Sequence, residues 1–414
     1  PIRVTKADTR RMEPGYTLLS VRRASQGRSP WRTFAQRNFM RAWGAIVILD
    51  PEGQVVWYYL GDSRFAGVKQ LANGNILANR ADSTTTELDL QGNILRQWYP
   101  AKAPPRKDGV LAGSRRADAV AIEGAEALHH QPFQLPNGNF LTYAAESQRI
   151  PNYYTSETDA TAPRQAQWVM GDEVIEFTPE GEVVWRWNCF DHLDPFKIGY
   201  DTFWSYWWVR GFPDHLDWTH GNGVHHDPRD NSVLLSLRNL DAVIKIDRST
   251  GQIRWILARD IAWSEPLRAK LLKPVGRDFI WPSHQHNPRL TPQGHIVLFN
   301  NNVHQAIPFT GERVKSASES LSQAVVYEIN EDERTASVVF STPTDASEGA
   351  VSFAMGDAHV LPRTGNVLVD FSLCYPGLNI ETFDANDLTR VYPDDLPSTP
   401  RIREYDFDDP LNPV

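Results

Sequence analysis

The sequence predicts an all-β protein, a six-bladed β-propeller of four-stranded antiparallel blades with long inserted loops on the channel face. Three observations predict this fold: two hairpin patterns recur, they alternate along the chain, and long insertions separate some of them. Repetition of one small unit is typical of propellers, in which a single sheet cannot bury both of its faces alone. No long window shows a helical period that would compete with this interpretation.

The first pattern is a strand, a short turn containing glycine, and a second strand that ends in tryptophan. Alternating apolar residues on both sides of a Pro, Asp, Gly or Asn turn indicate a β-hairpin. The copies are VILDPEGQVVWYY (Val47 to Tyr59), TELDLQGNILRQW (Thr86 to Trp98), IEFTPEGEVVWRW (Ile175 to Trp187), IKIDRSTGQIRWI (Ile244 to Ile256) and the degenerate VYEINEDERTASVVF (Val326 to Phe340).

The second pattern is another hairpin, and it alternates with the first. Its copies are LANGNILAN (Leu71 to Asn79), LPNGNFLTY (Leu135 to Tyr143), DPRDNSVLLS (Asp227 to Ser236), TPQGHIVLFN (Thr291 to Asn300) and LPRTGNVLVDF (Leu361 to Phe371). One hairpin of each kind makes a four-stranded blade, and blades of this kind stack around a central axis.

The alternation predicts complete blades at about 62–100, 125–190, 218–260, 282–342 and 352–390. The hairpin at 45–60 needs partner strands, either from Thr17 to Arg23 or from the C-terminal end, and it makes the sixth blade. A seventh blade requires one more degenerate copy. We therefore expect an N-terminal arm over 1–44 that contributes strands to a blade, a propeller over 45–390 and a C-terminal arm over 391–414.

Insertions lie at about 100–125, 146–171 and 189–217, and the last contains Phe203, Trp204, Tyr206, Trp207 and Trp208. Loops on the open face of a propeller usually hold or cover the substrate. The aromatic run is either core packing or a wall for an aromatic or sugar substrate, since flat rings bury much area at low entropy cost. Trp207 and Trp208 are the candidates for this wall.

Composition excludes several classes of function. The formal net charge of −9 and the pI of about 5.8 give no basic surface for nucleic acid, and no partner of that kind is expected. No apolar stretch reaches the roughly 18 residues of a membrane span. The two cysteines, Cys189 and Cys374, exclude a multi-cysteine zinc site and leave open whether they pair with each other.

Eight of the twelve histidines lie just before or at the start of the second hairpin pattern, where the innermost strand of a blade enters the channel. His130, Asn222 and His286 each lie six residues before the aligned proline, and His220 and His284 lie eight before it. Residues at the same offset in successive blades are expected at corresponding positions around one channel. The remaining members of the eight are His129, His225, His226 and His359.

Arg238 ends the second strand of the hairpin whose first strand follows His220. Adjacent antiparallel strands bring that end back beside His220. A guanidinium near several imidazoles and the Asn222 amide favours a site for an oxyanion such as sulfate or phosphate. We take His286, His220, Arg238 and His130 as the catalytic candidates.

At these residues the sequence resembles the PAPS-independent bacterial arylsulfotransferases. The resemblance depends on DWTHGNGVHHDPRDNSVLLSLRNLDAVIKI (Asp217 to Ile246), HQHNPRLTPQGHIVLFNN (His284 to Asn301) and, more weakly, LHHQPFQLPNGNFL (Leu128 to Leu141). It covers roughly residues 45–371. The chain differs from the better-known members in its denser histidine doublets and in the absence of an expected N-terminal β-sandwich domain, since only about 44 residues precede the first clear hairpin.

The resemblance implies transfer of a sulfuryl group from an aryl sulfate donor to a phenolic acceptor, with ping-pong kinetics and no PAPS. It implies that His286 is the nucleophile that becomes a sulfohistidine. It implies that His130, His220, Asn222 and Arg238 bind and neutralise the sulfuryl oxygens. Further candidates for substrate binding are the neighbouring His129 and His284 and the more distant His359. The resemblance also favours export to the periplasm or medium, and it implies no cofactor.

Three other interpretations stay open at this point. A copper or zinc enzyme would use histidines from several blades, with His130, His220 and His286 as ligands. Arg238 speaks against it, because a cation among the ligands disfavours a dication and favours an anion. A lyase or hydrolase acting on an acidic sugar is the second, and a non-catalytic binding propeller is the third.

Overall fold

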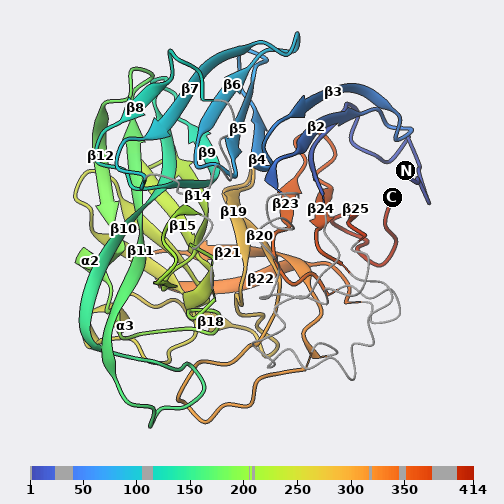
Figure 1. Cartoon of the computed structure of the whole chain (residues 1–414). Coiled ribbons are helices and arrows are strands. Elements are labelled where there is room, and N and C mark those ends of the chain that lie inside the picture. The colour runs from blue at the N-terminus through green and yellow to red at the C-terminus, as the bar shows by residue number, and fades with distance from the viewer. Residues whose placement is uncertain are drawn as a thin grey trace.

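Six small β-sheets are arranged around a central axis as a six-bladed β-propeller (Figure 1). The computed structural model describes residues 2–23, 41–104, 115–204, 206–207, 210–316, 319–344, 351–374 and 399–414. The two alternating hairpin patterns are the reason for this architecture, because each blade takes one hairpin of each kind. The all-β, six-bladed prediction is confirmed.

Four of the blades contain four antiparallel strands in chain order. Blade 2 consists of β4 (Phe65–Gln70), β5 (Ile76–Arg80), β6 (Thr85–Leu88) and β7 (Ile94–Pro100). Blade 3 consists of β9 (Leu128–Gln134), β10 (Phe140–Tyr153), β11 (Gln165–Phe177) and β12 (Val183–Asn188). Blade 4 consists of β14 (Gly221–Asp227), β15 (Ser232–Leu237), β16 (Ala242–Asp247) and β17 (Ile253–Leu257), and blade 5 of β19 (His286–Leu290), β20 (Ile296–Asn300), β21 (Gln323–Asn330) and β22 (Thr335–Ser341).

The first and last blades have three strands each among the described residues. Blade 1 is β1 (Thr17–Arg22), β2 (Gly44–Leu49) and β3 (Val55–Gly61), so the segment that follows Thr17 does pair with the 45–60 hairpin. Blade 6 is β23 (Asp357–Val360), β24 (Val367–Phe371) and β25 (Arg401–Tyr405). The C-terminal segment thus supplies a strand to the last blade.

Three sheets carry an additional edge strand that the repeat pattern does not predict. These are β8 (Val120–Ile122), which pairs with β7, β13 (His215–Asp217), which pairs with β11, and β18 (Lys273–Val275), which pairs with β22. All three pair in parallel and come from segments that connect one blade to the next. A returning segment that satisfies the unpaired groups of an edge protects the sheet from pairing with other chains.

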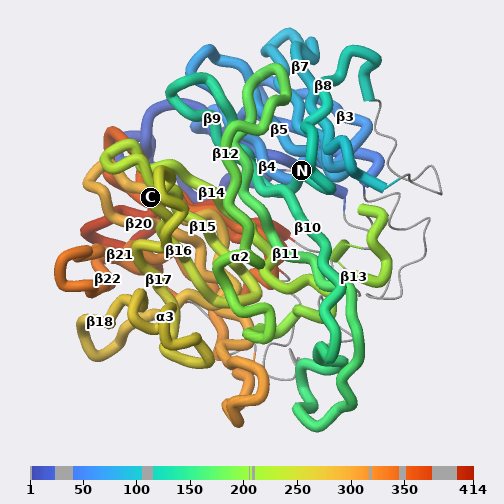
Figure 2. Tube along the Cα trace, turned by 90° about the vertical axis from the view of Figure 1, so that its left-hand side faces the viewer, coloured from blue at the N-terminus to red at the C-terminus, as the bar shows by residue number. Residues whose placement is uncertain are grey.

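The segment at 146–171, which the sequence analysis treats as a loop, is mostly regular strand. β10 and β11 continue their antiparallel register out to Tyr153 and Gln165, and the hairpin projects from the propeller as a long arm (Figure 2). The alternation of polar and apolar residues is lost there because both faces are partly exposed, so the period-2 signal is absent from the sequence. The short helices are α2 (Cys189–His192) and α3 (Glu265–Arg268), and η2 (Arg238–Leu240) is a 3₁₀ turn.

The apolar core lies between blades rather than in the channel. Leu141, Val174, Val233 and Ile244 are fully buried where blades 3 and 4 face each other. The inner strands β4, β9, β14, β19 and β23 follow one another around the axis. Their side chains are therefore the ones that can converge from several blades on one point. Within the described residues no helix has the length and apolarity needed to cross a membrane, and both cysteines are free.

The two ends of the chain close the ring. In Figure 1 the N- and C-termini lie near each other beside blades 1 and 6. The Glu13 side chain accepts a hydrogen bond from the Thr364 amide (2.9 Å), and Arg11 forms an ion pair with Asp406 (3.0 Å). The Glu13 amide donates to Glu404 (2.8 Å) on β25. The N-terminal residues are therefore held against blade 6, the last blade to be made.

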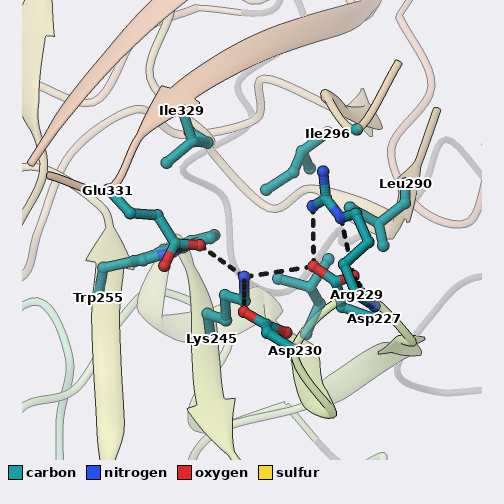
Figure 3. A pocket seen from close by; sticks show the side chains of 11 residues that line it. Asp227, Arg229, Asp230, Lys245, Trp255, Leu290, Ile296, Ile329 and Glu331 are labelled. Atoms are coloured by element: carbon teal, nitrogen blue, oxygen red, sulfur yellow. Dashed lines mark hydrogen bonds and ion pairs between the residues drawn. The ribbon is translucent and has the colours of Figure 1, made fainter. Parts of the chain in front are cut away.

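Blades 4 and 5 are also joined by a cluster of charges around a cavity of about 290 Å³ (Figure 3). The Lys245 ammonium on β16 lies 3.2 Å from Asp227, 2.7 Å from Asp230 and 2.5 Å from Glu331, which lies in the β21–β22 turn. Arg229 pairs with Asp227 as well (2.8 Å). Each of these charges is paired with one of opposite sign, so we interpret the cluster as a structural junction between the two blades.

We expect Lys245→Met to lower the free energy of unfolding by about 2–3 kcal/mol, because it leaves the buried Asp227 carboxylate with one cation fewer. Urea denaturation of the parent and the variant measures this difference. Lys273→Met, at an exposed lysine of β18, is the matched control and should leave the midpoint unchanged. Equal midpoints for Lys245→Met and the control would show that the junction does not hold the blades together.

Candidate active site

Three histidines from three different blades meet at the channel end where the inner strands begin. His130 lies on β9, His220 directly precedes β14, and His286 opens β19. The ring centroids of His130 and His220 are 5.3 Å apart. Besides burial, the charges of His220 and His286 lower the pKa of His130, and the charge of His220 lowers the pKa of His286. We refer to His130, His220, His286 and Arg238 as the upper cluster.

The backbone at these positions is unusual. His130, His220 and His284 have φ values of 60°, 47° and 50°, the left-handed region that non-glycine residues rarely adopt. His220 and His284 occupy equivalent offsets in blades 4 and 5, and their backbone conformations agree. Strained backbone of this kind persists where the surrounding structure holds it, and it is frequent at functional sites.

The hydrogen bonds of Asn301 fix the protonation of His286. The Asn301 amide nitrogen donates to the carbonyl oxygens of Ser352 (2.8 Å) and Met355 (3.0 Å), so its Oδ1 must accept. Its partner, 2.6 Å away, is Nδ1 of His286, which therefore carries the proton. Nε2 is left with its lone pair, toward which the Met355 amide points at 3.1 Å. Burial and the nearby Arg238 hold the pKa of His286 well below 6.5, so the ring is neutral near pH 7.

His220 forms a close pair with a buried carboxyl group. Its Nδ1 lies 2.5 Å from Oδ2 of Asp217, which β13 brings to the channel. Burial raises the pKa of Asp217 well above its ordinary value and lowers that of His220, with Arg238 adding to the second effect. The pair therefore shares a single proton at neutral pH. The Trp207 indole donates to the other oxygen of Asp217 (2.8 Å) and holds the carboxyl in place.

His130 is oriented from behind by His129 and Asp172. Nε2 of His129 lies 3.0 Å from Asp172, and the Nδ1 atoms of His129 and His130 lie 2.7 Å apart. His129 directs the proton on its Nε2 toward the Asp172 carboxylate, so its Nδ1 has only a lone pair. In the contact between the two Nδ1 atoms, the proton must therefore be on Nδ1 of His130. Nε2 of His130 is then unprotonated. Burial is the largest cause that holds the pKa of His130 well below 6.5.

Arg238 lies where the antiparallel register predicts, with its backbone amide donating to the His220 carbonyl (3.2 Å). The guanidinium is 1% exposed. Nη2 lies 2.7 Å from Asp201, Nη1 donates to Asn239 (2.9 Å), and Nε has no partner among the described residues. Asn222 is also buried: its amide nitrogen donates to the Gln285 carbonyl (2.7 Å) and its Oδ1 is unpartnered within the described chain.

His284 does not join the upper cluster but lies behind Arg238. Its Nδ1 is 3.1 Å from Asp241, and its Nε2 is 3.5 Å from Asp201, which His304 also approaches at 3.6 Å. Asp201, His284 and His304 are the group in the described chain whose ligand atoms could converge on a metal ion. The Arg238 guanidinium already neutralises Asp201, and its charge opposes a divalent cation there. This geometry does not favour the metal interpretation, and His130, His220 and His286 form no such group.

The aromatic insertion covers the upper cluster, but with different residues from those expected. The Tyr206 ring stacks on His130 (6.1 Å, 18°) and meets His220 edge-on at 4.3 Å, while Trp204 stacks on His220 (6.1 Å). Trp207 is 1% exposed and supports Asp217, so it is not part of the wall. Trp208 lies outside the described residues.

His359 is remote from the upper cluster. It is the third residue of β23, its side chain is 43% exposed, and its Nε2 lies 3.1 Å from Asp357. His129 is fully buried behind His130, so it is in position to orient that ring rather than to touch a substrate.

The acidic partners of the site were missed by the sequence analysis. Asp172, Asp201 and Asp217 lie outside the two hairpin patterns, and two of them come from the insertion at 189–217. For Asp217 the sequence did contain an indication, because this residue lies three positions before His220 in the segment Asp217 to Ile246. Asp201 had none. The Arg210 guanidinium, 4.2 Å above the Tyr206 ring, comes from the same insertion and was also not foreseen.

Comparison with known proteins gives the family. A family model described as Arylsulfotransferase (ASST) matches residues 3–406. The chain is 25% identical over 338 residues to the arylsulfate sulfotransferase AssT of Escherichia coli, covering 71% of this chain and 52% of that protein. The protein of the same name from Lelliottia amnigena is 23% identical over 332 residues, covering 70% and 51%. The chain thus spans about half the length of the curated relatives it matches.

Among solved structures, the chain is similar to a protein of unknown function from Bacteroides caccae, with a TM-score of 0.43 and 12% identity. That match covers 96% of this chain and 92% of the other. The Dos1 propeller is also similar, with a TM-score of 0.36 and 8% identity over 89% of this chain and 63% of that one.

The buried histidines predict a loss of stability in mild acid. His130, His220 and His286 have folded pKa values below 6.5, so below about pH 6.5 the unfolded chain binds more protons than the folded one and the free energy of unfolding falls. Each contributes at most about 1.4 kcal/mol per pH unit. His284, Asp217 and Glu157, whose pKa values are raised in the folded protein, contribute with the opposite sign, and Asp217 offsets its partner His220, so the share of one histidine is best isolated by a variant of that residue.

We expect His286→Asn to reduce this slope by about 1 kcal/mol per pH unit between about pH 6 and 5, measured by urea unfolding at several pH values. Lys273→Met is again the control and should keep the parent's slope. A slope in His286→Asn as steep as the parent's would mean that His286 is protonated in the folded protein.

Proposed function

This chain belongs to the arylsulfotransferase family, and on that premise we propose that it transfers a sulfuryl group from an aryl sulfate to a phenol through a sulfohistidine at His286. The observation that supports the proposal best is the hydrogen bonding of His286. Asn301 holds the proton on Nδ1, burial keeps the ring neutral, and the Nε2 lone pair is available to attack sulfur.

In the first half-reaction, Nε2 of His286 attacks the sulfur of the donor. The N–S bond forms as the bond between sulfur and the aryl oxygen breaks, and the phenolate leaves with the electron pair. The sulfur then takes the place of the Met355 amide, which donates to the same lone pair in the free protein.

The His220–Asp217 pair supplies the proton that the leaving phenolate needs. The raised pKa of Asp217 and the lowered pKa of His220 favour the form in which Asp217 holds the proton against Nδ1 and His220 carries its own proton on Nε2. Nε2 gives its proton to the leaving oxygen while Nδ1 takes the proton of Asp217. The imidazole remains neutral and the charge is left on the carboxylate.

The second half-reaction reverses these movements. The acceptor phenol gives its proton to Nε2 of His220, and Asp217 recovers its own proton from Nδ1. The acceptor oxygen forms a bond to sulfur as the N–S bond breaks, which returns the lone pair to His286. Because donor and acceptor use the same groups in turn, the kinetics are ping-pong. Nε2 of His130, whose ring lies 5.3 Å from that of His220, remains as a second proton acceptor.

Arg238 is the fixed positive charge of the reaction. Its Nε–H is unpartnered and buried, and it can bind a sulfuryl oxygen while the Asp201 ion pair holds the guanidinium in position. Asn222 can contribute only the second hydrogen of its amide nitrogen, because its unpartnered Oδ1 is an acceptor and would repel a sulfuryl oxygen. Groups oriented in advance toward developing charge usually supply the largest share of catalysis, about 10²–10³ in rate for a single donor.

We propose that the reaction needs no cofactor, since a neutral imidazole, a guanidinium and a shared proton account for each bond made and broken. The stacking of Trp204 and Tyr206 on the histidines supports an aromatic group in both substrates.

Incubation with an aryl sulfate and no acceptor, after chelation, should raise the intact mass of the protein by one sulfuryl group. The mass is recorded at neutral pH to preserve the N–S bond. His286→Asn should show no gain and lose at least about 10³ in turnover, because the nucleophile is missing. His359→Asn is the matched control and should gain the group as the parent does. Modification of His286→Asn, or a requirement for metal, would contradict the sulfohistidine.

A series of aryl sulfates with different leaving phenols tests the role of His220. We expect His220→Gln to lower kcat/KM by about 10²–10⁴ for donors with basic phenols and much less for nitrophenyl sulfate, whose phenolate needs no proton. Asp217→Asn should show the same dependence on the leaving group. An equal loss across the series would assign His220 to binding rather than to proton transfer.

A further inference from the structure

A second cluster of side chains converges on the channel axis farther along the inner strands. Its members are Lys69 on β4, Phe133 on β9, His225 on β14, Arg289 on β19 and Asp357 on β23, one from each of five strands. We refer to these five residues as the lower cluster. His225 lies five residues beyond His220, and Arg289 and Phe133 each lie three beyond His286 and His130, so at about 3.3 Å per residue the two clusters are roughly 10–16 Å apart along the strands.

A hydrogen-bonded bridge separates the two clusters. Arg289 of blade 5 lies 2.7 Å from Asp357 of blade 6 and donates to Gln131 of blade 3, also at 2.7 Å. Blade 4 lies between blades 3 and 5, so this contact crosses the channel. The Gln131 amide nitrogen is anchored on the Val68 carbonyl at 2.6 Å. A ligand of the lower cluster is therefore separate from the reacting groups of the upper cluster.

Lys69 lacks an anionic partner in the described chain. The Lys69 ammonium lies 3.9 Å from the centroid of the Phe133 ring, and Asp357, the carboxylate whose charge acts on it, is paired with Arg289. The lower cluster thus contains two cations and one carboxylate, although the protein as a whole has a formal charge of −9. A half-buried ammonium with no counter-charge favours an anion from solution.

His225 adds a neutral donor beside the ammonium. Its ring packs edge-on against Phe133 at 4.8 Å, and the described residues offer its nitrogens no hydrogen bond. Burial, Arg289 and Lys69 lower the pKa of His225 to about 3, so it stays neutral and offers one N–H. His359, 43% exposed and 3.1 Å from Asp357, shows that this end of the channel reaches solvent.

We propose that the lower cluster is a second, anion-binding site, in which the Lys69 ammonium and the His225 ring bind a small oxyanion such as sulfate, phosphate or a carboxylate. The site stands apart from the proposed sulfuryl transfer and does not depend on it. Phe133 forms one apolar side of the site, and the Arg289–Asp357 pair forms its floor.

The titration of Lys69 tests the proposal directly. Burial, followed by Arg289, lowers its pKa to about 8 in the free protein, and a bound anion should raise it by roughly 1–3 units. Protein labelled with [13Cε]lysine is titrated by NMR with and without inorganic phosphate. The Lys69 signal is identified as the one missing from Lys69→Met, or from Lys69→Arg should the first variant not fold.

Lys197 is the internal control. Burial also lowers its pKa to about 8, but its ammonium donates to the Ile261 carbonyl (3.1 Å) and it lies outside the channel cluster. Phosphate should move the midpoint of Lys69 and leave that of Lys197 unchanged. The same shift should persist in Arg238→Met, which removes the cation of the upper cluster.

Two results would overturn the proposal. One is a Lys69 midpoint that stays the same at saturating phosphate, and the other is an equal movement of Lys69 and Lys197, which reports ionic strength alone. Loss of the shift in Arg238→Met would assign the anion to the upper cluster and overturn it as well. Repeating the titration with sulfate and acetate then ranks the oxyanions that the site accepts.

Discussion

The buried guanidinium of Arg238 requires a buried counter-charge, and this requirement governs how the rest of the site is built. A charge removed from water is tolerated only when it is paired and hydrogen-bonded. Asp201 supplies the partner at 2.7 Å, from an insertion that belongs to no blade. Asp201 is itself held by Glu157, which accepts from its backbone amide and belongs to the segment between β10 and β11. The Arg238–Asp201 ion pair thus attaches the insertions that contain Asp201 and Glu157 to the propeller, and it fixes how they cover the channel.

The sequence was sufficient for the fold where the residues repeat. Alternating hairpins predicted six blades and the order of their strands, because a period-2 apolar pattern with a glycine turn has one structural meaning. It was insufficient where a strand is short or pairs outside its own hairpin. β8, β13 and β18 have three residues each and find their partners through tertiary contact, and the β10–β11 arm has only isolated buried positions such as Ile150 and Tyr153, too few to impose a pattern.

The residues of the site likewise fall into those that the repeat predicts and those that it does not. The offset from the aligned proline brought His130, Asn222 and His286 to one end of the channel, and the antiparallel register placed Arg238 beside His220, because these positions are set by the repeat. Of the carboxyl groups that orient them, Asp201 and Asp217 come from an insertion without a counterpart in other blades, so no alignment within the chain could reveal them, and Asp172 lies on β11 outside the repeated hairpin patterns. Tyr206 rather than Trp207 contacts His130 and His220, since the direction of a side chain in an irregular loop depends on its neighbours and not on composition.

The contact between Glu13 and Thr364 joins residues 351 positions apart. During synthesis blade 1 is complete long before blade 6, so the growing chain is an open arc in which each end blade leaves one face uncovered and β24 lacks its partner strand until β25 has emerged. Contacts of such long sequence separation are slow to form, and an exposed edge invites pairing with other chains. Until the ring is complete, the nascent protein is most vulnerable to misassembly, and a chaperone that covers the exposed faces of blades 1 and 6 would act at that stage.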